Sequence, residues 1–97
     1  MTQGITREEA KRMVGPGWSG ILDRLYDKLP KKLYVMQVKE KYGSLRFYVG
    51  SASNRTFDLI SKAEKESETT CEMCEKPGEI KQIRGWYSCR CPECEEK

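Results

Sequence analysis

The chain has 97 residues, a formal net charge of +3 and charged side chains at 34 % of its positions. A chain of this length buries only roughly two thirds of its unfolded surface, which limits it to one thin-cored domain or a small domain with a stapled appendage. No stretch approaches the ~20 apolar residues of a membrane-spanning helix, and the start, "MTQGITREEAKRM", lacks the apolar run of a secretion signal. We therefore expect a cytoplasmic protein whose cysteines stay reduced.

Two amphipathic helices are predicted before residue 30. The segment "TREEAKRMV" opens with a capping box, in which Thr6 is followed three residues later by Glu9, and it stops at "GPG". From Trp18 to Pro30, apolar residues recur at spacings of three and four, which predicts one apolar stripe along a second helix. The stripe consists of Ile21, Leu22, Leu25, Tyr26 and Leu29. We expect Trp18 to anchor the core at the start of this helix.

A two-stranded antiparallel hairpin is predicted over residues 33–49, "LYVMQVKEKYGSLRFYV", with Gly43 and Ser44 in its turn. Alternation assigns one set of side chains to each arm. The sets are Tyr34, Met36 and Val38 in the first arm and Leu45, Phe47 and Val49 in the second. Because two strands alone are marginal in water, we expect helices to cover one face of the hairpin.

A third helix is predicted over about residues 54–68, with Asn54 as its cap. Its apolar side is formed by Phe57, Leu59, Ile60 and Ala63. The helix runs directly into Cys71, so we expect the chain beyond it to pack against the body with little slack. The sequence thus predicts an α+β fold, in which a helix and β-hairpin body of order α-α-β-β-α (residues 1–69) precedes a zinc-ribbon-like module (residues 70–97).

The spacing of the cysteines in the tail is the most specific signal in the chain. Two residues separate Cys71 from Cys74 and Cys91 from Cys94, and sixteen residues lie between the pairs. This pattern is typical of a four-cysteine zinc site, and "EIKQIRGWYSC" between the pairs predicts a short hairpin that breaks near residues 84–85. Four protein ligands leave no coordination position for water or substrate, so the predicted zinc is structural. Its binding free energy of ~10–16 kcal/mol would order the module.

Cys89 is the spare cysteine in this interpretation. In an extended segment Cys89 and Cys91 share a face, so the pattern does not force the choice between them. A two-residue turn presents two thiolates more readily than a one-residue gap, which favours Cys91 as the ligand. Cys89 is then a small half-buried residue beside the site, with a reactive thiol made acidic by the metal and by Arg90 as the alternative. An iron–sulfur cluster is the alternative to zinc, but the paired turns favour zinc.

Three blocks of the chain, "GWSGILDRLYDKL", "QVKEKYGSLRFYVG" and the terminal "CEMCEKPG" with "GWYSCRCPEC", resemble a family of small, mostly uncharacterised proteins encoded by bacteriophages and prophages. The resemblance covers roughly residues 17–94 and implies a Gly-Trp helix, a hairpin ending in Arg-Phe-Tyr and a metal-binding tail. In that family the last ligand is often histidine and the position of Cys89 is not a cysteine, which supports Cys91 and Cys94 as ligands. Cys94 in place of histidine is a departure, although both coordinate zinc. The family has no established activity, so the resemblance implies provenance and fold rather than function.

Basic residues concentrate in the first half of the chain. Residues 1–50 hold ten Lys or Arg against five Asp or Glu, whereas residues 71–97 hold five against six. Four thiolates on zinc add a net charge of about −2, which makes the tail unsuitable for gripping a phosphate backbone. Cations and rings of the hairpin, with the rings of the tail, are therefore the candidate partner-binding residues: Lys39, Lys41, Tyr42, Arg46, Tyr48, Trp86 and Tyr87. The alternative is a solvated strand face whose rings support the core.

Enzymatic functions are disfavoured, because the chain has no histidine and contains neither a deaminase motif nor a phosphate-binding loop. Two functional hypotheses remain. In the first, a phage protein binds a host or phage protein through the hairpin edge and the exposed rings, and it inhibits or adapts a host enzyme such as a defence or transcription component. In the second, the protein is a nucleic-acid-binding accessory that uses the basic hairpin. The oligomeric state stays open, because a hairpin edge can also dock a second copy.

Overall fold

The computed structural model of the chain describes residues 3–95 and confirms the predicted α+β fold with a C-terminal group of four cysteines. The outer ends of the predicted segments 1–69 and 70–97 lie outside the described residues. We call residues 3–69 the body and residues 70–95 the C-terminal module. In chain order the elements are β1 (Gln3–Gly4), α1 (Arg7–Met13), the 3₁₀ helix η1 (Pro16–Trp18), α2 (Ser19–Lys28), β2 (Tyr34–Lys41), β3 (Ser44–Val49), α3 (Asn54–Ser67), β4 (Glu79–Ile83), β5 (Trp86–Arg90) and α4 (Pro92–Glu95).

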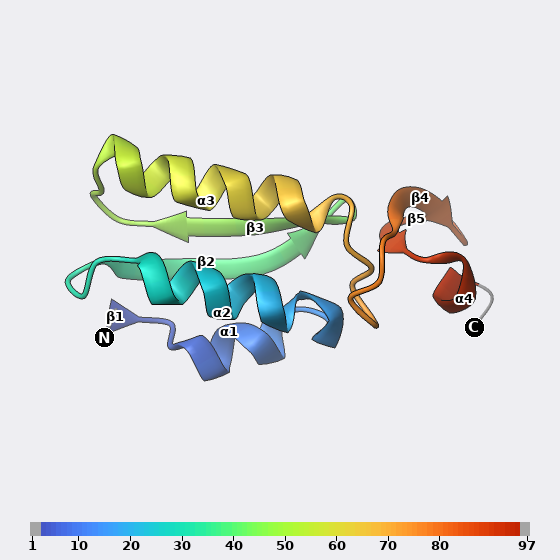
Figure 1. Cartoon of the computed structure of the whole chain (residues 1–97), viewed down its shortest axis with the longest axis horizontal. Helices are drawn as coiled ribbons and strands as arrows, with labels where there is room; N and C mark the ends of the chain where they lie inside the picture. The colour runs from blue at the N-terminus through green and yellow to red at the C-terminus, as the bar shows by residue number, and fades with distance from the viewer. Residues whose placement is uncertain (1–2, 96–97) are drawn as a thin grey trace.

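The molecule is elongated, 41 × 23 × 20 Å, because the C-terminal module lies at one end of the body (Figure 1). In the body, α2 and α3 lie side by side on one face of the sheet, and α1 packs beside α2. No helix among the described residues has the length and apolar content that a membrane span requires.

Both predicted N-terminal helices are confirmed, and their ends follow local chemistry. α1 begins after Thr6, whose side chain accepts a hydrogen bond from the backbone N–H of Glu9 while the Glu9 carboxylate accepts one from the backbone N–H of Thr6. This reciprocal capping box satisfies two N–H groups that the first turn leaves unpaired. Pro16 then opens η1, and α2 ends before Leu29, because the residue before a proline avoids helical dihedrals.

The body sheet has three strands rather than the predicted two, in the order β1-β2-β3. β2 and β3 pair antiparallel, as predicted, across a turn at Tyr42 and Gly43 whose φ values of 55° and 83° match a type I′ turn. The turn therefore ends before Ser44, which belongs to β3. β1 pairs parallel with β2 at Gln3↔Tyr34 and Gly4↔Val35. A strand of two residues is too short to show a period in the sequence.

The alternation predicted for the first arm of the hairpin is wrong at its start. Val35 and Val38 are buried, whereas Tyr34 is 55 % exposed and Met36 is 60 % exposed. The cause is a register shift between Val35 and Gln37, where β2 carries an extra residue against β3. A bulge of this kind reverses the inward and outward positions of the residues on one side of it. The second arm follows the prediction, because Leu45 and Phe47 are buried and Val49 packs against the core.

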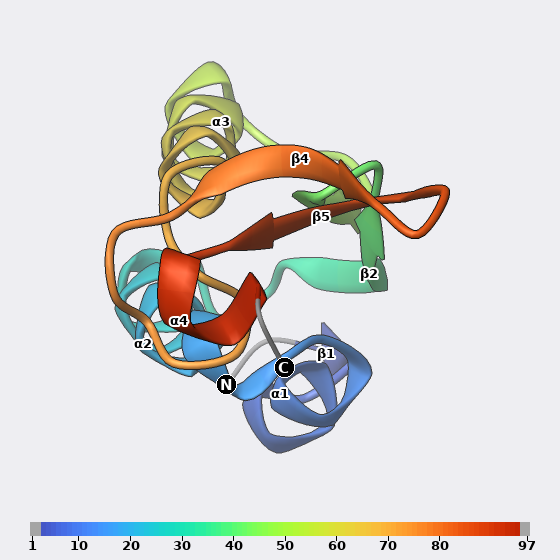
Figure 2. The same cartoon turned by 90° about the vertical axis from the view of Figure 1, so that its right-hand side faces the viewer.

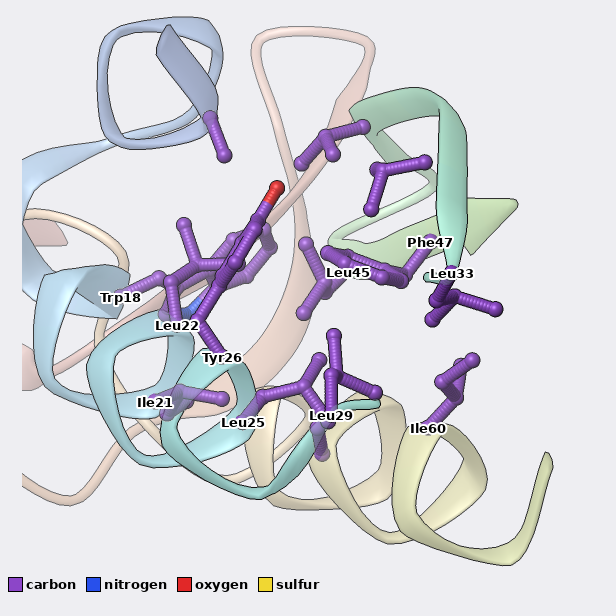
Figure 3. Packing of buried hydrophobic residues seen from close by; sticks show 14 of the residues in the cluster. Trp18, Ile21, Leu22, Leu25, Tyr26, Leu29, Leu33, Leu45, Phe47 and Ile60 are labelled. Carbon is purple, nitrogen blue, oxygen red and sulfur yellow. The ribbon is translucent and has the colours of Figure 1, made fainter. Parts of the chain in front are cut away.

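The core fills the space between α2, α3 and the inner face of the sheet (Figure 3). The predicted stripe of α2 is buried along its whole length, and Trp18 is fully buried at its start, as predicted. The side chains that meet them come from the sheet, its flanking loop and α3: Leu33, Val35, Val38, Leu45, Phe47, Ile60 and Ala63.

α3 is confirmed as a helix but differs from the prediction at two positions. Ser53, not Asn54, caps the helix, because the Ser53 hydroxyl accepts a hydrogen bond from the backbone N–H of Thr56. Phe57 is 47 % exposed, because the buried stripe runs through Thr56, Ile60, Ala63 and Ser67, one residue off the position of Phe57. The prediction from apolar residues alone therefore placed Phe57 wrongly on the buried face of α3.

The outer edge of β3 is closed by side chains of α3. The backbone N–H of Leu45 donates to the hydroxyl of Ser67 at 2.9 Å, and the backbone N–H of Phe47 donates to the carboxylate of Glu64 at 2.9 Å. These groups would otherwise be open donors on an edge strand, the usual template for pairing with another chain. The fully buried Ser67 also donates to the carbonyl of Glu64, so its hydroxyl is satisfied in both roles.

Replacing Ser67 with alanine removes the acceptor of the Leu45 N–H and leaves that buried group unpaired. We expect Ser67→Ala to lower the free energy of unfolding by about 1–3 kcal/mol. Urea unfolding of the metal-loaded protein measures the change. The matched control is Ser61→Ala, at an exposed position of the same helix, which should change stability by less than about 0.5 kcal/mol. Equal losses in the two variants would contradict the edge-closing role of Ser67.

Alkaline pH tests the burial of Tyr26, which is 8 % exposed and donates its hydroxyl hydrogen to the carbonyl of Ile5 at 2.9 Å. Burial raises the pKa of Tyr26 from 10.0 to about 12. The folded state thus holds the phenolic proton more tightly than the unfolded chain does. Its contribution is complete below pH ~10 and is lost as the pH rises towards ~12.

We expect the wild type to lose about 1–2 kcal/mol more stability than Tyr26→Phe over that interval. Denaturant unfolding at several pH values measures the difference. Tyr34→Phe, at an exposed position, is the control that keeps the wild-type profile. Parallel profiles for the wild type and Tyr26→Phe would contradict the prediction.

Candidate metal centre

Four cysteine sulfurs converge in the C-terminal module. Cys71 and Cys74 lie in the loop that follows α3, whereas Cys91 follows β5 and Cys94 lies in α4. All four Sγ atoms lie within 4.8 Å of one another, and those of Cys74 and Cys91 are 3.4 Å apart. Three of the residues are buried and Cys74 is exposed. The structure therefore brings together the four sequence-predicted ligands in a group that could hold a metal ion.

The first cysteine pair is held in a tight turn by backbone hydrogen bonds. The N–H of Cys71 donates to the carbonyl of Lys76 at 2.8 Å, and the N–H of Glu75 donates to the carbonyl of Cys71 at 3.0 Å. Glu75, directly after Cys74, has a φ of 72°, so the turn places this residue in the left-handed conformation. A residue with a Cβ is strained in this conformation, so the turn is maintained by its surroundings and not by the preference of Glu75.

The second pair is positioned by a proline and a single helical turn. Pro92 opens α4, where its fixed φ suits the first helical position and its missing N–H leaves no donor unpaired. Cys91 and Cys94 are three residues apart, which places them on one side of the turn. β4 and β5 join the two pairs as an antiparallel hairpin, and the break predicted near residues 84–85 is confirmed by a type I′ turn at Arg84 and Gly85.

The first cysteine pair rests directly on the body. The indole N–H of Trp18 donates to the carbonyl of Thr70 at 2.9 Å, and the backbone N–H of Gly17 donates to the carbonyl of Glu72 at 2.7 Å. A Cβ atom at Gly17 would overlap the carbonyl oxygen of Cys71, so only glycine fits at this contact. The end-on view in Figure 2 shows the loop after α3 lying beside the start of α2. Gly17 was not among the predicted site residues, although the run "GPGW" was its visible signal in the sequence.

Cys89 lies outside the group of four sulfurs. It is fully buried, packs with the core of the body and donates its thiol hydrogen to the carbonyl of Glu68 at 3.4 Å. It is therefore more deeply buried than the half-buried position expected from the sequence. Burial raises the pKa of the Cys89 thiol to about 11, and the negative charges of Cys71 and Glu72 add to this shift. A neutral, enclosed thiol is a packing residue rather than a nucleophile.

The four clustered thiols differ in acidity. Burial alone would raise the pKa of Cys71, but the backbone N–H groups of three neighbours, Cys91 first among them, lower it to about 6. Contacts with the thiols of Cys74 and Cys91, together with burial, raise the pKa of Cys94 to about 12. A metal ion would displace the protons that such thiols hold, so the affinity of this centre for a metal falls as the pH falls.

Two cations lie beside the sulfurs. The pKa of Lys76 is raised by its contact with Glu93, at 3.2 Å, and by the charges of nearby thiolates. Arg90 Nε lies 3.5 Å from the carboxylate of Glu72, and its Nη1 donates to the carbonyl of Cys94 at 3.5 Å. Cations and donors around a thiolate centre offset its negative charge and orient the loops that carry the ligands. This contact of Arg90 with the loops of the site was not predicted from the sequence.

Six of the seven candidate partner-binding residues gather on one surface, which we call the aromatic–basic surface: Lys39, Lys41, Tyr42, Arg46, Tyr48 and Tyr87. The ammonium group of Lys39 lies 5.9 Å from the ring centroid of Tyr48, and that of Lys41 lies 5.5 Å from the ring centroid of Tyr42. Lys39 is the cross-strand partner of Arg46, so their side chains share the outer face of the sheet.

Tyr87 extends this surface across the boundary between the body and the C-terminal module. Its ring meets that of Tyr42 edge-on, with the ring centroids 6.1 Å apart. Beneath the contact, Gly43 of the body turn approaches Ile80 of β4. Trp86 is 78 % exposed but precedes Tyr87 on β5, and alternation directs it to the other face of that strand. The surface is therefore built from both parts of the chain.

Comparison of the chain with family models, with curated proteins and with solved structures finds no match.

Substitution of each cysteine in turn tests which four bind metal. We expect Cys89→Ala to retain the wild-type metal content per chain. Loss of a residue that only contacts a ligand lowers metal affinity by roughly 10–100-fold, and we expect Cys91→Ala to lower it by more than this. Elemental mass spectrometry measures the content, and competition with a chelator measures the affinity. Cys89 lies in β5 and Cys91 lies just after it, so Cys89→Ala is also the matched control for the loss of one thiol from this segment. Greater loss in Cys89→Ala than in Cys91→Ala would contradict this ligand set.

Proposed function

We propose that Cys71, Cys74, Cys91 and Cys94 hold one zinc ion as a structural centre. A tetrahedral zinc site with Zn–S bonds of about 2.3 Å places its sulfurs about 3.8 Å apart. The sulfurs here lie within 4.8 Å of one another, with one pair at 3.4 Å, so the cage fits with small adjustments. Two turns joined by a hairpin favour zinc over an iron–sulfur cluster. Four protein ligands close the coordination sphere, so we assign the zinc no catalytic role.

The protein acts, in this proposal, by binding another protein through the aromatic–basic surface. The observation that carries the proposal is the exposed edge-on pair of Tyr42 and Tyr87, which joins the body to the C-terminal module. Tyrosines of this kind are enriched at the anchors of protein interfaces, because they bury much area for little lost conformational entropy. Trp86 is exposed on the other face of β5, so this surface does not include it.

The backbone of Tyr42 supports the same conclusion. Tyr42 occupies the first central position of a type I′ turn with a φ of 55°, where asparagine, aspartate or glycine is favoured. A bulky residue in this conformation is strained by about 1–2 kcal/mol. Its ring is 64 % exposed, so burial does not compensate for the strain. A tyrosine that destabilises its own turn and faces solvent is best explained by contact with a partner.

Zinc would act on this surface indirectly. The rings of Tyr42 and Tyr87 meet only while the C-terminal module stays against the body. Few large apolar side chains hold the module, whereas zinc binding in comparable modules supplies ~10–16 kcal/mol. Zinc thus keeps the two halves of the surface in register.

The resemblance to phage-encoded proteins suggests a biological role for this binding. A small phage-encoded protein that works in the host cytoplasm, without catalysis, would inhibit or adapt a larger host enzyme, such as a defence or transcription component. The closed edge of β3 favours docking by side chains over addition of a strand to the sheet at that edge. Nucleic-acid binding by the basic hairpin is the alternative, because the same lysines and arginine would serve it.

Affinity capture from the producing cells tests the proposal with a matched pair of variants. Tyr87 is 49 % exposed on the surface and Phe57 is 47 % exposed on α3, so alanine removes a similar ring in each case. We expect the wild type and Phe57→Ala, both zinc-loaded, to capture the same protein. Tyr87→Ala and the chelator-treated wild type should retain less than about a tenth of it, the loss typical of an interface anchor.

Quantitative mass spectrometry of the captured proteins, after nuclease treatment of the extract, measures these ratios. Equal capture by Tyr87→Ala and Phe57→Ala would place the binding site elsewhere. Loss of all specific capture after nuclease treatment would favour the nucleic-acid alternative.

A further inference from the structure

The outer face of β2 and β3 carries three cations, Lys39, Lys41 and Arg46. In the part of the chain that the structure describes, none of the three lies within 4.0 Å of a carboxylate oxygen, as is also the case for surface lysines such as Lys31 and Lys32. These three are distinguished by lying together on one face of the sheet, where Lys39 is the cross-strand partner of Arg46. The Nε atom of Arg46 is buried and has no hydrogen-bond partner in the part of the chain that the structure describes. The face thus presents positive charge that the fold itself leaves unneutralised.

The two lysines are pre-positioned by tyrosine rings. Lys39 lies over Tyr48 and Lys41 lies over Tyr42, at the distances given for cation–π contacts. Each ammonium group therefore lies over one of the two ring faces on which a nucleic-acid base could stack. The ammonium hydrogens that face away from the ring stay available to an anion. This arrangement suits recognition of carboxylates better than stacking of bases.

The spacing and the surrounding charges favour a peptide as the source of those carboxylates. Lys39 and Lys41 are two residues apart on one strand, which separates their Cα atoms by about 7 Å, the same interval as alternate residues of an extended peptide. Beyond Lys41 lies the C-terminal module, whose basic residues do not exceed its acidic ones and whose thiolates add negative charge. A long phosphate backbone that followed the cations would run into this negative region.

We propose that the outer face of β2 and β3 binds an extended acidic segment of a partner protein, in which one carboxylate pairs with Lys39 and its cross-strand neighbour Arg46 and the next alternate carboxylate pairs with Lys41. This inference rests on the proposed protein-binding function and names the chemistry of the partner. Tyr42 and Tyr87 then contact the apolar residues that flank the acidic segment.

A defined probe tests the proposal on the zinc-loaded full chain labelled with ¹⁵N. The probe is a peptide of about 12 residues in which glutamate alternates with serine, matched by a peptide with glutamine in place of glutamate and by a deoxythymidine strand of similar length. We expect the acidic peptide to shift the amide resonances of Lys39, Lys41 and Arg46. The glutamine peptide should shift none of them, and the deoxythymidine strand should bind at least tenfold more weakly than the acidic peptide.

Charge reversal on two pairs of lysines supplies the matched variants. Lys39→Glu with Lys41→Glu should weaken binding of the acidic peptide at least tenfold. Lys31→Glu with Lys32→Glu makes the same change in net charge at exposed positions of the loop before β2 and should weaken it less than about twofold. The ¹⁵N spectrum of each variant shows that it keeps the fold.

Tighter binding of the deoxythymidine strand at the same three residues would overturn the proposal in favour of nucleic acid. Equal loss in the two double variants, or absence of binding by the acidic peptide, would overturn it as well. These outcomes would overturn the proposed acidic partner, and they differ from the outcomes that would overturn the proposed protein-binding function. Capture of a protein partner that depends on Tyr87 but not on Lys39 and Lys41 would leave the protein-binding function standing with a partner that is not acidic.

Discussion

The contact between the glycine loop before α2 and the first cysteine pair is the constraint on which the arrangement of this protein depends. Trp18 is fully buried and donates its indole N–H to the carbonyl of Thr70, while Gly17 lies so close to Cys71 that no side chain fits between them. One tryptophan therefore both starts the core of the body and fixes the loop that carries two of the four sulfurs. A flexible linker at this point would leave the sulfur group intact but separate it from the body.

The consequence of that contact appears where the turn of the body hairpin meets the hairpin of the C-terminal module. The turns of both hairpins are type I′, and each places a residue other than glycine, Tyr42 or Arg84, in the left-handed region. The turn of the body packs against β4, and Tyr42 meets Tyr87 edge-on. The local strain at Tyr42 is tolerated because packing elsewhere holds the turn. The sulfur group and the aromatic–basic surface are thus joined through one junction between the body and the C-terminal module.

Some surfaces of the molecule have their hydrogen-bonding and charged groups paired within the fold, whereas others present such groups to the outside. The edge of β3 is closed by Ser67 and Glu64, Arg7 and Lys11 of α1 pair with carboxylates of α2, and Cys89 is enclosed in the core. In contrast, the outer face of β2 and β3 presents exposed rings and, among the described residues, cations that no carboxylate neutralises. Under the proposed function, a partner would therefore dock on this face through side chains rather than along the closed edge of β3.

Local patterns in the sequence were sufficient to predict α1, α2, α3, the two hairpins and the four cysteines that cluster. The capping box at Thr6, the apolar stripe after Trp18 and the two CxxC pairs each depend on residues a few positions apart, so they are visible without a structure. Only the tertiary structure decided the bulge after Val35, the pairing of β1, the capping of the β3 edge by α3 and the burial of Cys89. The physical reason is that each of these depends on which distant backbone group lies within hydrogen-bonding or packing distance, and neither periodicity nor spacing along a chain carries that information.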